Sequence, residues 1–325
     1  MARMIVTLTA NPSLDRAVTL AATLRPGEVQ AALTAREDAG GKGINVSRVI
    51  ASAGVATLAI LPLGSNDPFA AALHGSRIPI RTVPITGHAR ANTTITDPDG
   101  VTTKLNLPGA ALSVGERDAV IAAVVDASAG ADWLVLAGSL PPGASDTFYV
   151  DIIAAVRQAH GEHAPRIAVD TSGPALHAVV TQASPDLIKP NDEELAELAG
   201  AELAPELDLA AAAAALARQL VPARVKAALV TLGGAGAVLV NASGAVFASP
   251  PPITVVSTVG AGDSSLAGYL LAEIAGETAS GCVANAVRYG SAAASLPGTL
   301  APTSSDLPVG EIHVSSIDPL AGAVA

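Results

Sequence analysis

The stretch Ser257-Thr-Val-Gly-Ala-Gly-Asp-Ser-Ser-Leu-Ala-Gly268 decides how this chain is organised. An apolar, strand-like run, Ile253 to Val256, precedes it, and a helical run, Ser264 to Ala275, begins inside it. Between the two runs, the turn Gly260-Ala261-Gly262 carries almost no side chains, so its backbone can approach a ligand closely. The start of a helix presents unpaired N–H groups and a partial positive charge, which suit phosphate oxygens. The stretch therefore predicts an anion-binding turn at a helix N-terminus.

Asp263 follows this turn directly. A carboxylate beside an anion site fits phosphoryl transfer, because it can accept the proton of an attacking hydroxyl group. The alternative is structural, since an aspartate after a glycine turn can simply cap a helix N-terminus. The stretch alone does not decide between a catalytic base and a helix cap.

Composition restricts the class of protein. The 325 residues are enough for one large α/β domain with a small accessory element, and half of them are hydrophobic, which predicts a sizeable core. A formal net charge of −11 argues against a nucleic-acid partner or an anionic membrane surface. No apolar run approaches the ~18 residues of a membrane span, and no signal-peptide layout opens the chain. With a single cysteine, Cys282, an internal disulfide is ruled out, and we expect a cytoplasmic protein.

Short apolar runs alternate with helical runs along most of the chain. Strands are predicted at residues 5–9, 56–61, 80–84, 133–137, 167–170, 187–189, 227–231, 237–241 and 245–248. One helical run begins within residues 39–46 and extends to residue 53. Further helices are predicted at residues 68–77, 114–127, 145–160, 174–181, 192–200, 207–220, 264–275 and 281–295. This alternation indicates a mostly parallel sheet covered by helices on both faces. Ligands of such sheets bind at the carboxyl ends of the strands. Polar or glycine-rich motifs follow Thr9, Ala137, Asp170, Lys189 and Val256.

Two hairpin regions are more polar than the other strands. One comprises strand candidates at residues 16–20 and 28–35, and the other pairs 91–96 with 101–105 around an Asp-Pro-Asp-Gly turn. We expect them to project as a small β lid, at about residues 12–38 and 88–108 of a single domain spanning 1–325. Both regions carry apolar residues, which are Val18, Leu20, Val29, Leu33, Ile95 and Leu105. A small sheet cannot bury two faces on its own chain, so the lid predicts a homodimer. The tail from residue 297 has no clean period and carries no prediction.

Known nucleotide-binding and hydrolase motifs are missing. Gly40-Gly41-Lys42-Gly43 is not a Walker A loop, because the first glycine would fall at Arg36 and Gly43 stands where serine or threonine should follow the lysine. The absence of a dinucleotide fingerprint disfavours an oxidoreductase. The absence of His-Glu-x-x-His, Cys-x-x-Cys and Gly-x-Ser-x-Gly excludes zinc and serine hydrolases. Lys42 before a helix, with Asn45 one turn on, would instead present a cation and an amide to a sugar phosphate.

Asn191-Asp-Glu-Glu194 permits two interpretations. Asparagine followed three residues later by glutamate is a helix capping box. In the functional interpretation, Glu194 orders water around Mg²⁺ at the nucleotide phosphates, because magnesium keeps several waters when it is bound. Both can hold at once. Similarly, Arg90 at the start of a lid strand is either a phosphate ligand or an ordinary exposed arginine.

Residues 40–48, Gly-Gly-Lys-Gly-Ile-Asn-Val-Ser-Arg, and residues 257–263 resemble the two signatures of the ribokinase-like carbohydrate kinases of PfkB type. Four further segments appear between them in the family's order, at residues 138–141, 170–173, 189–191 and 231–233. The resemblance covers roughly residues 4 to 300. It implies a three-layer α/β sandwich with a mostly parallel central sheet and a small β lid, and dimers that pair through such lids.

Within the family, residues 9–15, residues 103–106 with Pro108-Gly109, and the start Ser257-Thr258-Val259 resemble the phosphosugar branch. The resemblance implies ATP-dependent phosphorylation of a ketohexose phosphate, above all fructose 1-phosphate to fructose 1,6-bisphosphate. Tagatose 6-phosphate and fructose 6-phosphate are the alternative acceptors. A non-catalytic sugar-phosphate sensor on the same fold is a more distant alternative, against which the intact Asp263 and its glycine turn argue.

The resemblance also implies a set of site residues. Asp263 would be the catalytic base, and the backbone N–H groups of Gly260, Ala261 and Gly262 would stabilise the transferring phosphoryl group. The sugar phosphate would contact Asp15, Gly40, Gly41, Lys42, Asn45, Arg90 and Ser139, with Lys42, Arg90 and Ser139 on its phosphate. The nucleotide would contact Lys189, Asn191, Thr231, Gly233, Gly236 and Val259. Glu194 would hold Mg²⁺ through water.

Overall fold

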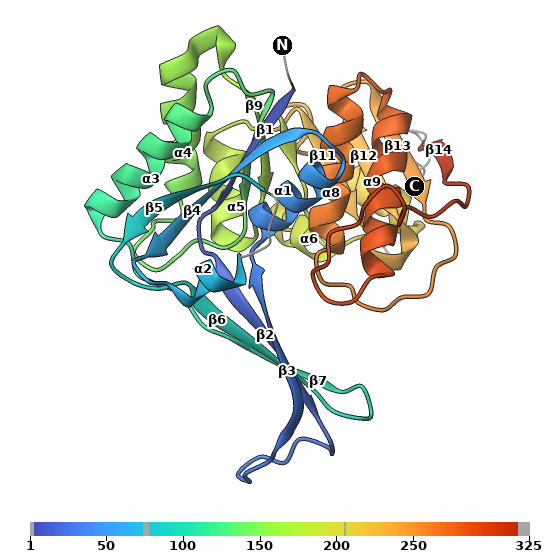
Figure 1. The fold of residues 1–325 in the computed structure, drawn as a ribbon. Coiled ribbons are helices and arrows are strands. Elements are labelled where there is room, and N and C mark those ends of the chain that lie inside the picture. Colours follow the sequence, from blue (N-terminus) through green and yellow to red (C-terminus); the bar gives the residue numbers. More distant parts are fainter. Residues whose placement is uncertain (1–2, 74–77, 205, 318–325) are drawn as a thin grey trace.

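A computed structural model describes residues 3–73, 78–204 and 206–317 of the chain, which form two sheets and the helices around them (Figure 1). The strands of the large sheet are β1 (Met4–Thr9), β4 (Ala56–Gly64), β5 (Ile80–Ile85), β8 (Trp133–Ala137), β9 (Arg166–Asp170), β10 (Leu187–Ile188), β11 (Ala227–Thr231), β12 (Ala237–Asn241), β13 (Gly244–Ser249) and β14 (His313–Ile317). The small sheet contains β2 (Ser13–Leu20), β3 (Ala32–Gly40), β6 (Arg90–Thr96) and β7 (Thr102–Asn106).

The helices are α1 (Lys42–Ser52), α2 (Pro68–Ala72), α3 (Val114–Ala127), α4 (Phe148–His160), α5 (Gly173–Gln182), α6 (Asp192–Ala199), α7 (Leu209–Ala217), α8 (Ala261–Ile274) and α9 (Ala279–Ala294). Short 3₁₀ turns lie at Gly161–His163 and Gly233–Ala235. No helix in the described part of the chain combines the length and the apolar character needed to cross a membrane.

The large sheet has the strand order β14-β13-β12-β11-β10-β9-β8-β1-β4-β5. It is parallel from β11 to β5, whereas β11 to β14 pair antiparallel. Successive strand residues point to opposite faces, so Ile5 packs with α1, α8 and α9, and Val6 packs with α3 and α4. Helices thus cover both faces of the sheet, and the predicted three-layer, ribokinase-like architecture is confirmed.

The two hairpin regions come together in one four-stranded sheet of order β3-β2-β6-β7, which projects from the body (Figure 1). The predicted bounds of its first hairpin are wrong. Strand β3 covers Ala32–Gly40 rather than 28–35, because its pairing with β2 continues as far as Ser13 opposite Gly40. Residues ahead of it form a turn, in which Gln30 accepts from the N–H of Arg25 and donates to the carbonyl of Thr23.

The predicted strand Ile253 to Val256 is also wrong, since this run is an irregular segment. Three prolines, residues 250–252, precede it, and proline removes the N–H that a sheet ladder needs. The edge position beside β13 is taken instead by β14, from the tail that carried no prediction. Three helices are shorter than expected: α4 begins at Phe148, α7 spans Leu209–Ala217, and α2 ends at Ala72. The remainder of the predicted helix 68–77 falls largely on residues 74–77, outside the described residues.

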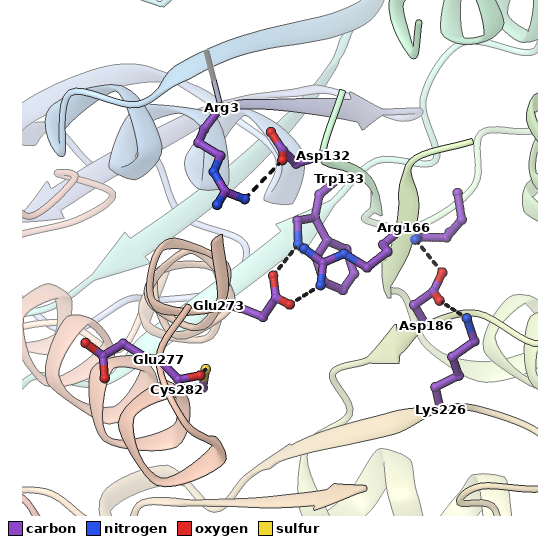
Figure 2. Close-up of polar contacts among 10 residues, drawn as sticks. Arg3, Asp132, Trp133, Arg166, Asp186, Lys226, Glu273, Glu277 and Cys282 are labelled. Atoms are coloured by element: carbon purple, nitrogen blue, oxygen red, sulfur yellow. Dashed lines mark hydrogen bonds and ion pairs between the residues drawn. The ribbon is translucent and has the colours of Figure 1, made fainter. Parts of the chain in front are cut away.

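A polar cluster fastens the far end of α8 to the sheet (Figure 2). Glu273, in the last turn of α8, accepts a 3.0 Å hydrogen bond from Trp133 Nε1 and forms an ion pair with Arg166. The guanidinium of Arg166 lies 4.5 Å from the centre of the Trp133 ring. Since Trp133 begins β8 and Arg166 begins β9, this cluster holds α8 against the amino ends of two strands. The opposite end of the same helix carries Asp263.

Candidate active site

Asp263 lies in the first turn of α8 and is buried, with 7% of its surface exposed. The helix cap is Gly260, whose left-handed φ of 77° favours glycine, and no side chain caps the helix. Instead, Asp263 Oδ2 accepts a 2.8 Å hydrogen bond from Asn45 Nδ2 of α1. The alternative of a capping aspartate is therefore wrong, and the carboxylate faces the interior beside the turn. Within that turn, the N–H of Ala261 donates a long hydrogen bond, 3.3 Å, to Thr258 O.

The environment of Asp263 favours its protonated form. Burial, followed by the negative charge of Asp170, raises its pKa to about 6. Lys42, the hydrogen bond from Asn45 and Lys189 act in the opposite direction and only partly offset these effects. A carboxyl group with this pKa is largely ionised at neutral pH and still basic enough to accept a proton.

Asp170 joins two cations at the carboxyl end of β9. Its side chain is wholly buried, with Oδ1 2.7 Å from Lys42 Nζ and Oδ2 3.3 Å from Lys189 Nζ. Burial by itself raises the pKa of Asp170, but Lys189 and Lys42 outweigh it and hold that pKa below the ordinary value. The candidate list from the sequence missed this residue. Two features of the sequence could have indicated it: Asp170 ends a predicted buried strand, and the chain has only four lysines with which a buried carboxylate could pair.

Lys42 pairs with Asp170 while 36% of its side chain stays exposed. The carboxylates of Asp170, Asp263 and Glu194 all raise the pKa of Lys42, with Asp170 first. Lys42 thus lies among the carboxylates near the candidate base. Its neighbour Gly41, which caps α1, has a φ of 128°, and a Cβ there would come 2.5 Å from Thr9 Cγ2, so glycine is required.

The small sheet presents Asp15 to the same region. Asp15 Oδ1 accepts from Ser13 Oγ at 2.8 Å and from Asn92 Nδ2 at 3.2 Å. Burial raises the pKa of Asp15. Gly40 on β3 approaches so closely that a Cβ would lie 2.0 Å from Asp15 Oδ2. The sheet therefore forms a close-packed polar surface from residues that are distant in sequence.

Arg90 has an unused donor on this surface. Its Nη1 donates to Leu107 O at 3.3 Å, whereas its Nε is buried without a hydrogen-bond partner among the described residues. The same holds for the Oδ1 of Asn92. Buried polar groups are usually satisfied, and these two atoms share their exception with the side-chain oxygens of Ser128, Asp170 and Thr171. Ser139 is exposed after β8, and its Oγ accepts a long hydrogen bond, 3.4 Å, from Asn11.

A cavity of about 690 Å³ adjoins the other side of the α8 turn. Four residues predicted for the nucleotide line it, which are Asn191, Thr231, Gly233 and Gly236, together with Ala261 and Gly262 of the turn. Gly236 approaches the chain so closely that a Cβ would lie 2.0 Å from Ala248 O. Two other predicted residues do not line this cavity: the ammonium of Lys189 is directed at Asp170, and Val259 is 42% exposed. The cavity has room for a nucleotide beside an anion-binding turn.

The capping box at the start of α6 is confirmed. Asn191 Oδ1 accepts from the N–H of Glu194 at 2.6 Å, and Glu194 Oε2 accepts from the N–H of Asn191 at 3.0 Å. The second oxygen, Oε1, has no hydrogen-bond partner among the described residues. Glu194 lines a separate cavity of about 570 Å³ between α5, α6 and the residues just before α4. The described residues contain no cluster of three metal-binding side chains.

Comparisons with known proteins agree with this geometry. Residues 9–306 match the family described as pfkB family carbohydrate kinase. The chain is 36% identical over 284 residues to 1-phosphofructokinase of Rhodobacter capsulatus, covering 85% of each protein. It is 32% identical to phosphofructokinase-2 from Escherichia coli, solved in complex with fructose-6-phosphate and as a tetrameric inhibited form, each with a TM-score of 0.81 and coverage of 92% of this chain and 96% of the other.

Ribokinase from Arabidopsis thaliana, solved with ribose and ATP, is 22% identical with a TM-score of 0.72, covering 95% of this chain and 96% of that one. This likeness concerns the fold alone. The match to the family and the identity to its relatives both extend over most of the chain. The chain therefore belongs to the pfkB family of carbohydrate kinases.

Proposed function

We propose that this protein is an ATP-dependent kinase that converts fructose 1-phosphate to fructose 1,6-bisphosphate. The observation that carries the proposal is the position of Asp263, a buried carboxylate at the N-terminus of α8 between the polar surface of the small sheet and the 690 Å³ cavity. A sugar hydroxyl on one side and a nucleotide phosphate on the other would meet there. The 1-phosphofructokinase of Rhodobacter capsulatus is a relative with this acceptor in its name.

In the proposed reaction, the hydroxyl oxygen of the sugar attacks the terminal phosphorus of ATP while its proton passes to Asp263. The bond from that phosphorus to the bridging oxygen breaks, and ADP leaves. The N–H groups of the turn Gly260-Ala261-Gly262, at the positive end of α8, stabilise the charge on the transferring group. Asn45 holds the carboxylate of Asp263 in place throughout.

The residues around the cavity fit ATP and Mg²⁺. The lining is largely apolar, and it ends at the helix N-terminus that suits the phosphates. Asn191, Thr231, Gly233 and Gly236 would contact the nucleotide there, with Lys189 and Val259 on its phosphate side. Glu194 lines the separate 570 Å³ cavity, and the carboxylate oxygen that its capping box leaves unused would hold Mg²⁺ through water. When bound, the metal neutralises phosphate charge.

The phosphate already present on the sugar would be held by Arg90, Lys42 and Ser139, and its hydroxyl groups by Asp15, Gly40, Gly41 and Asn45. The buried, unpartnered Nε of Arg90 supports this assignment, because arginine can hold a phosphate through two parallel hydrogen bonds. In a chain with a net charge of −11, an anionic acceptor needs such local positive charge.

A coupled assay of ADP release with a panel of sugars tests the proposal. Fructose 1-phosphate should give the highest kcat/KM, ahead of fructose 6-phosphate, tagatose 6-phosphate and free fructose. Preference for fructose 6-phosphate would support the second candidate, favoured by the likeness to phosphofructokinase-2 from Escherichia coli. Binding of phosphosugars without any ADP release would instead indicate a sensor.

The small sheet is proposed as a lid, at about residues 12–38 and 88–108 of a single domain, that also forms a homodimer. Asp15 and Val18 are an odd number of positions apart on β2, so they point to opposite faces of the sheet. Val18 lies beside Ile95 in the register of β2 and β6, and Leu105 on β7 is 57% exposed. The face away from the site thus carries Val18, Ile95 and Leu105, beside the ion pair of Arg16 and Glu37, and would be covered by the lid of a second copy. A cytoplasmic location fits its substrates.

A further inference from the structure

Asp170 is the residue on which the charges of the site converge, although it is not among the residues predicted to bind substrate or nucleotide. It ends β9, in the middle of the parallel sheet, and its side chain has no exposed surface. Lys42 comes from the first turn of α1, and Lys189 follows β10. Three separate segments therefore bring one carboxylate and two ammonium groups together at the carboxyl edge of the sheet.

We propose that Asp170 is a positioning residue for phosphoryl transfer, because it holds the ammonium groups of Lys42 and Lys189 beside Asp263. The proposal rests on the proposed kinase function. The contacts that carry it are 2.7 Å from Oδ1 to Lys42 Nζ and 3.3 Å from Oδ2 to Lys189 Nζ. Each carboxylate oxygen thus faces a different lysine: Oδ1 accepts a hydrogen bond from Lys42, whereas Oδ2 forms an ion pair with Lys189 without hydrogen-bond geometry.

Lys189 links this group to the anion-binding turn. It is 5% exposed, and a Cβ on Gly262 would lie 3.2 Å from its Nζ. An ammonium at this distance from the turn adds a full positive charge to the partial charge of the helix N-terminus. Asp170 keeps that ammonium pointed at the turn rather than at solvent. In this way Asp170, which contacts neither substrate, fixes the position of the Lys189 ammonium.

The charges also balance in a way that suits the reaction. With Asp263 ionised, two lysines and two aspartates give a net charge of zero. When Asp263 accepts the proton of the sugar hydroxyl, the four groups carry a net charge of +1, at the moment when negative charge accumulates on the departing nucleotide. Preorganised charge of this kind is effective in a buried site, where water screens little.

The groups that face Asp263 are few and act in opposite directions. Asp170 at the end of β9 raises its pKa, whereas Lys42 and the amide of Asn45 on α1, and Lys189 after β10, lower it. Arg48 on α1 acts through Asn45, to whose Oδ1 it donates at 3.1 Å. Substitutions of Asp170 and of Lys42 should therefore move the pH dependence of catalysis in opposite directions, which a purely structural role would not do.

The test uses Asp170→Asn, which keeps the shape and removes the charge. We expect kcat to fall by about 10²–10³-fold, the size of loss seen when one charge-stabilising group is removed. The acidic limb of the kcat profile should move to lower pH. Lys42→Met should move the same limb to higher pH. This second variant keeps the test valid if Asp170→Asn does not fold. An unmoved limb in either active variant would overturn the proposal.

The matched control is Asp186→Asn. Like Asp170, Asp186 pairs with a lysine, Lys226 (Figure 2), but it does so at the amino end of the strands, where it accepts from the backbone N–H of Ile167. The substitution Asp186→Asn should leave kcat and the acidic limb of its pH profile unchanged. A role of Asp170 in holding Mg²⁺ would instead appear as a raised Mg²⁺ requirement with an unmoved limb, which contradicts the proposal. The sugar panel with the unaltered protein tests the kinase function separately.

Discussion

Asn45 Nδ2 donates a 2.8 Å hydrogen bond to Asp263 Oδ2, although 218 positions separate the two residues in the sequence. Arg48, one turn further along α1, donates to Asn45 Oδ1 at 3.1 Å, so the orientation of the amide is fixed. This hydrogen bond joins the N-terminal turns of α1 and α8. It leaves Asp263 Oδ1 available for a proton from an acceptor hydroxyl.

Asp263→Asn should abolish turnover and spare substrate binding. The amide keeps the hydrogen bond from Asn45 but cannot accept a proton, and loss of a general base typically lowers the rate by about 10²–10⁴-fold. Stopped assays of ADP formation measure kcat, and calorimetry measures the Kd of the phosphosugar. A kcat within a few-fold of the unaltered protein would show that Asp263 is not the base.

The same substitution should stabilise the fold at neutral and alkaline pH. Burial raises the pKa of Asp263 to about 6, so the native state binds a proton more tightly than the unfolded chain does. The free energy of unfolding is therefore lowered as the pH rises through that value. Since each pKa unit corresponds to about 1.4 kcal/mol, the ionised carboxylate weakens folding by about 3 kcal/mol above pH 6. Urea unfolding of Asp263→Asn should show this gain at pH 8 and lose it as the pH approaches 4. An equal difference at both pH values would mean that charge is not its cause.

Activity should depend on pH through the same group. The base acts only when ionised, and its pKa is about 6, so kcat should fall as the pH is lowered through that value. A profile of kcat between pH 5 and 8, with saturating sugar phosphate and ATP, measures this limb. A flat profile across pH 6 would contradict the environment assigned to Asp263.

Arg90→Ala should weaken binding of the phosphosugar alone. A hydrogen bond to a charged group contributes about 1.5–3 kcal/mol, so KM for the sugar phosphate should rise by about 10- to 100-fold while KM for ATP stays nearly unchanged. Arg81→Ala is the control, because Arg81 forms an exposed pair with Asp126 on the body of the protein. Equal loss for both substrates, or full activity of the unaltered protein on free fructose, would refute the assignment.

The lid should form the dimer interface. Light scattering of the unaltered protein should report about twice 32.0 kDa, and Ile95→Lys should return the mass to that of one chain. A lysine on the apolar face would leave a charge in the interface, which is unfavourable without a partner. Val309→Lys is the control, since Val309 is fully exposed on the body. A monomer with full activity would show that the lid needs no partner.

The fold was predictable because its signals are local. Alternating strands and helices, the turn before Asp263 and the capping box at Asn191 each follow from a few neighbouring residues. Strand β14 and the failure of the run Ile253 to Val256 were not predictable, because segments distant in sequence compete for the sheet edge. Hydrophobic pattern shows that a segment is apolar but not whether an edge is free for it.

The site was predictable in its motifs and not in its contacts. Asp263 and the residues along the cavity stand in recognisable local patterns. Asp170 was missed because its importance comes from Lys42 and Lys189, which lie on other segments and meet it only in the folded chain. Burial and pairing of charges are properties of the tertiary structure, so they set the pKa of Asp263 in a way no local pattern reveals.

Phosphorus NMR of the reaction products tests the central claim most directly. With fructose 1-phosphate, ATP and Mg²⁺, the unaltered protein should produce fructose 1,6-bisphosphate and ADP in equal amounts, and Asp263→Asn should produce neither at a measurable rate. Release of inorganic phosphate with the sugar left unchanged, or transfer that persists in Asp263→Asn, would contradict it.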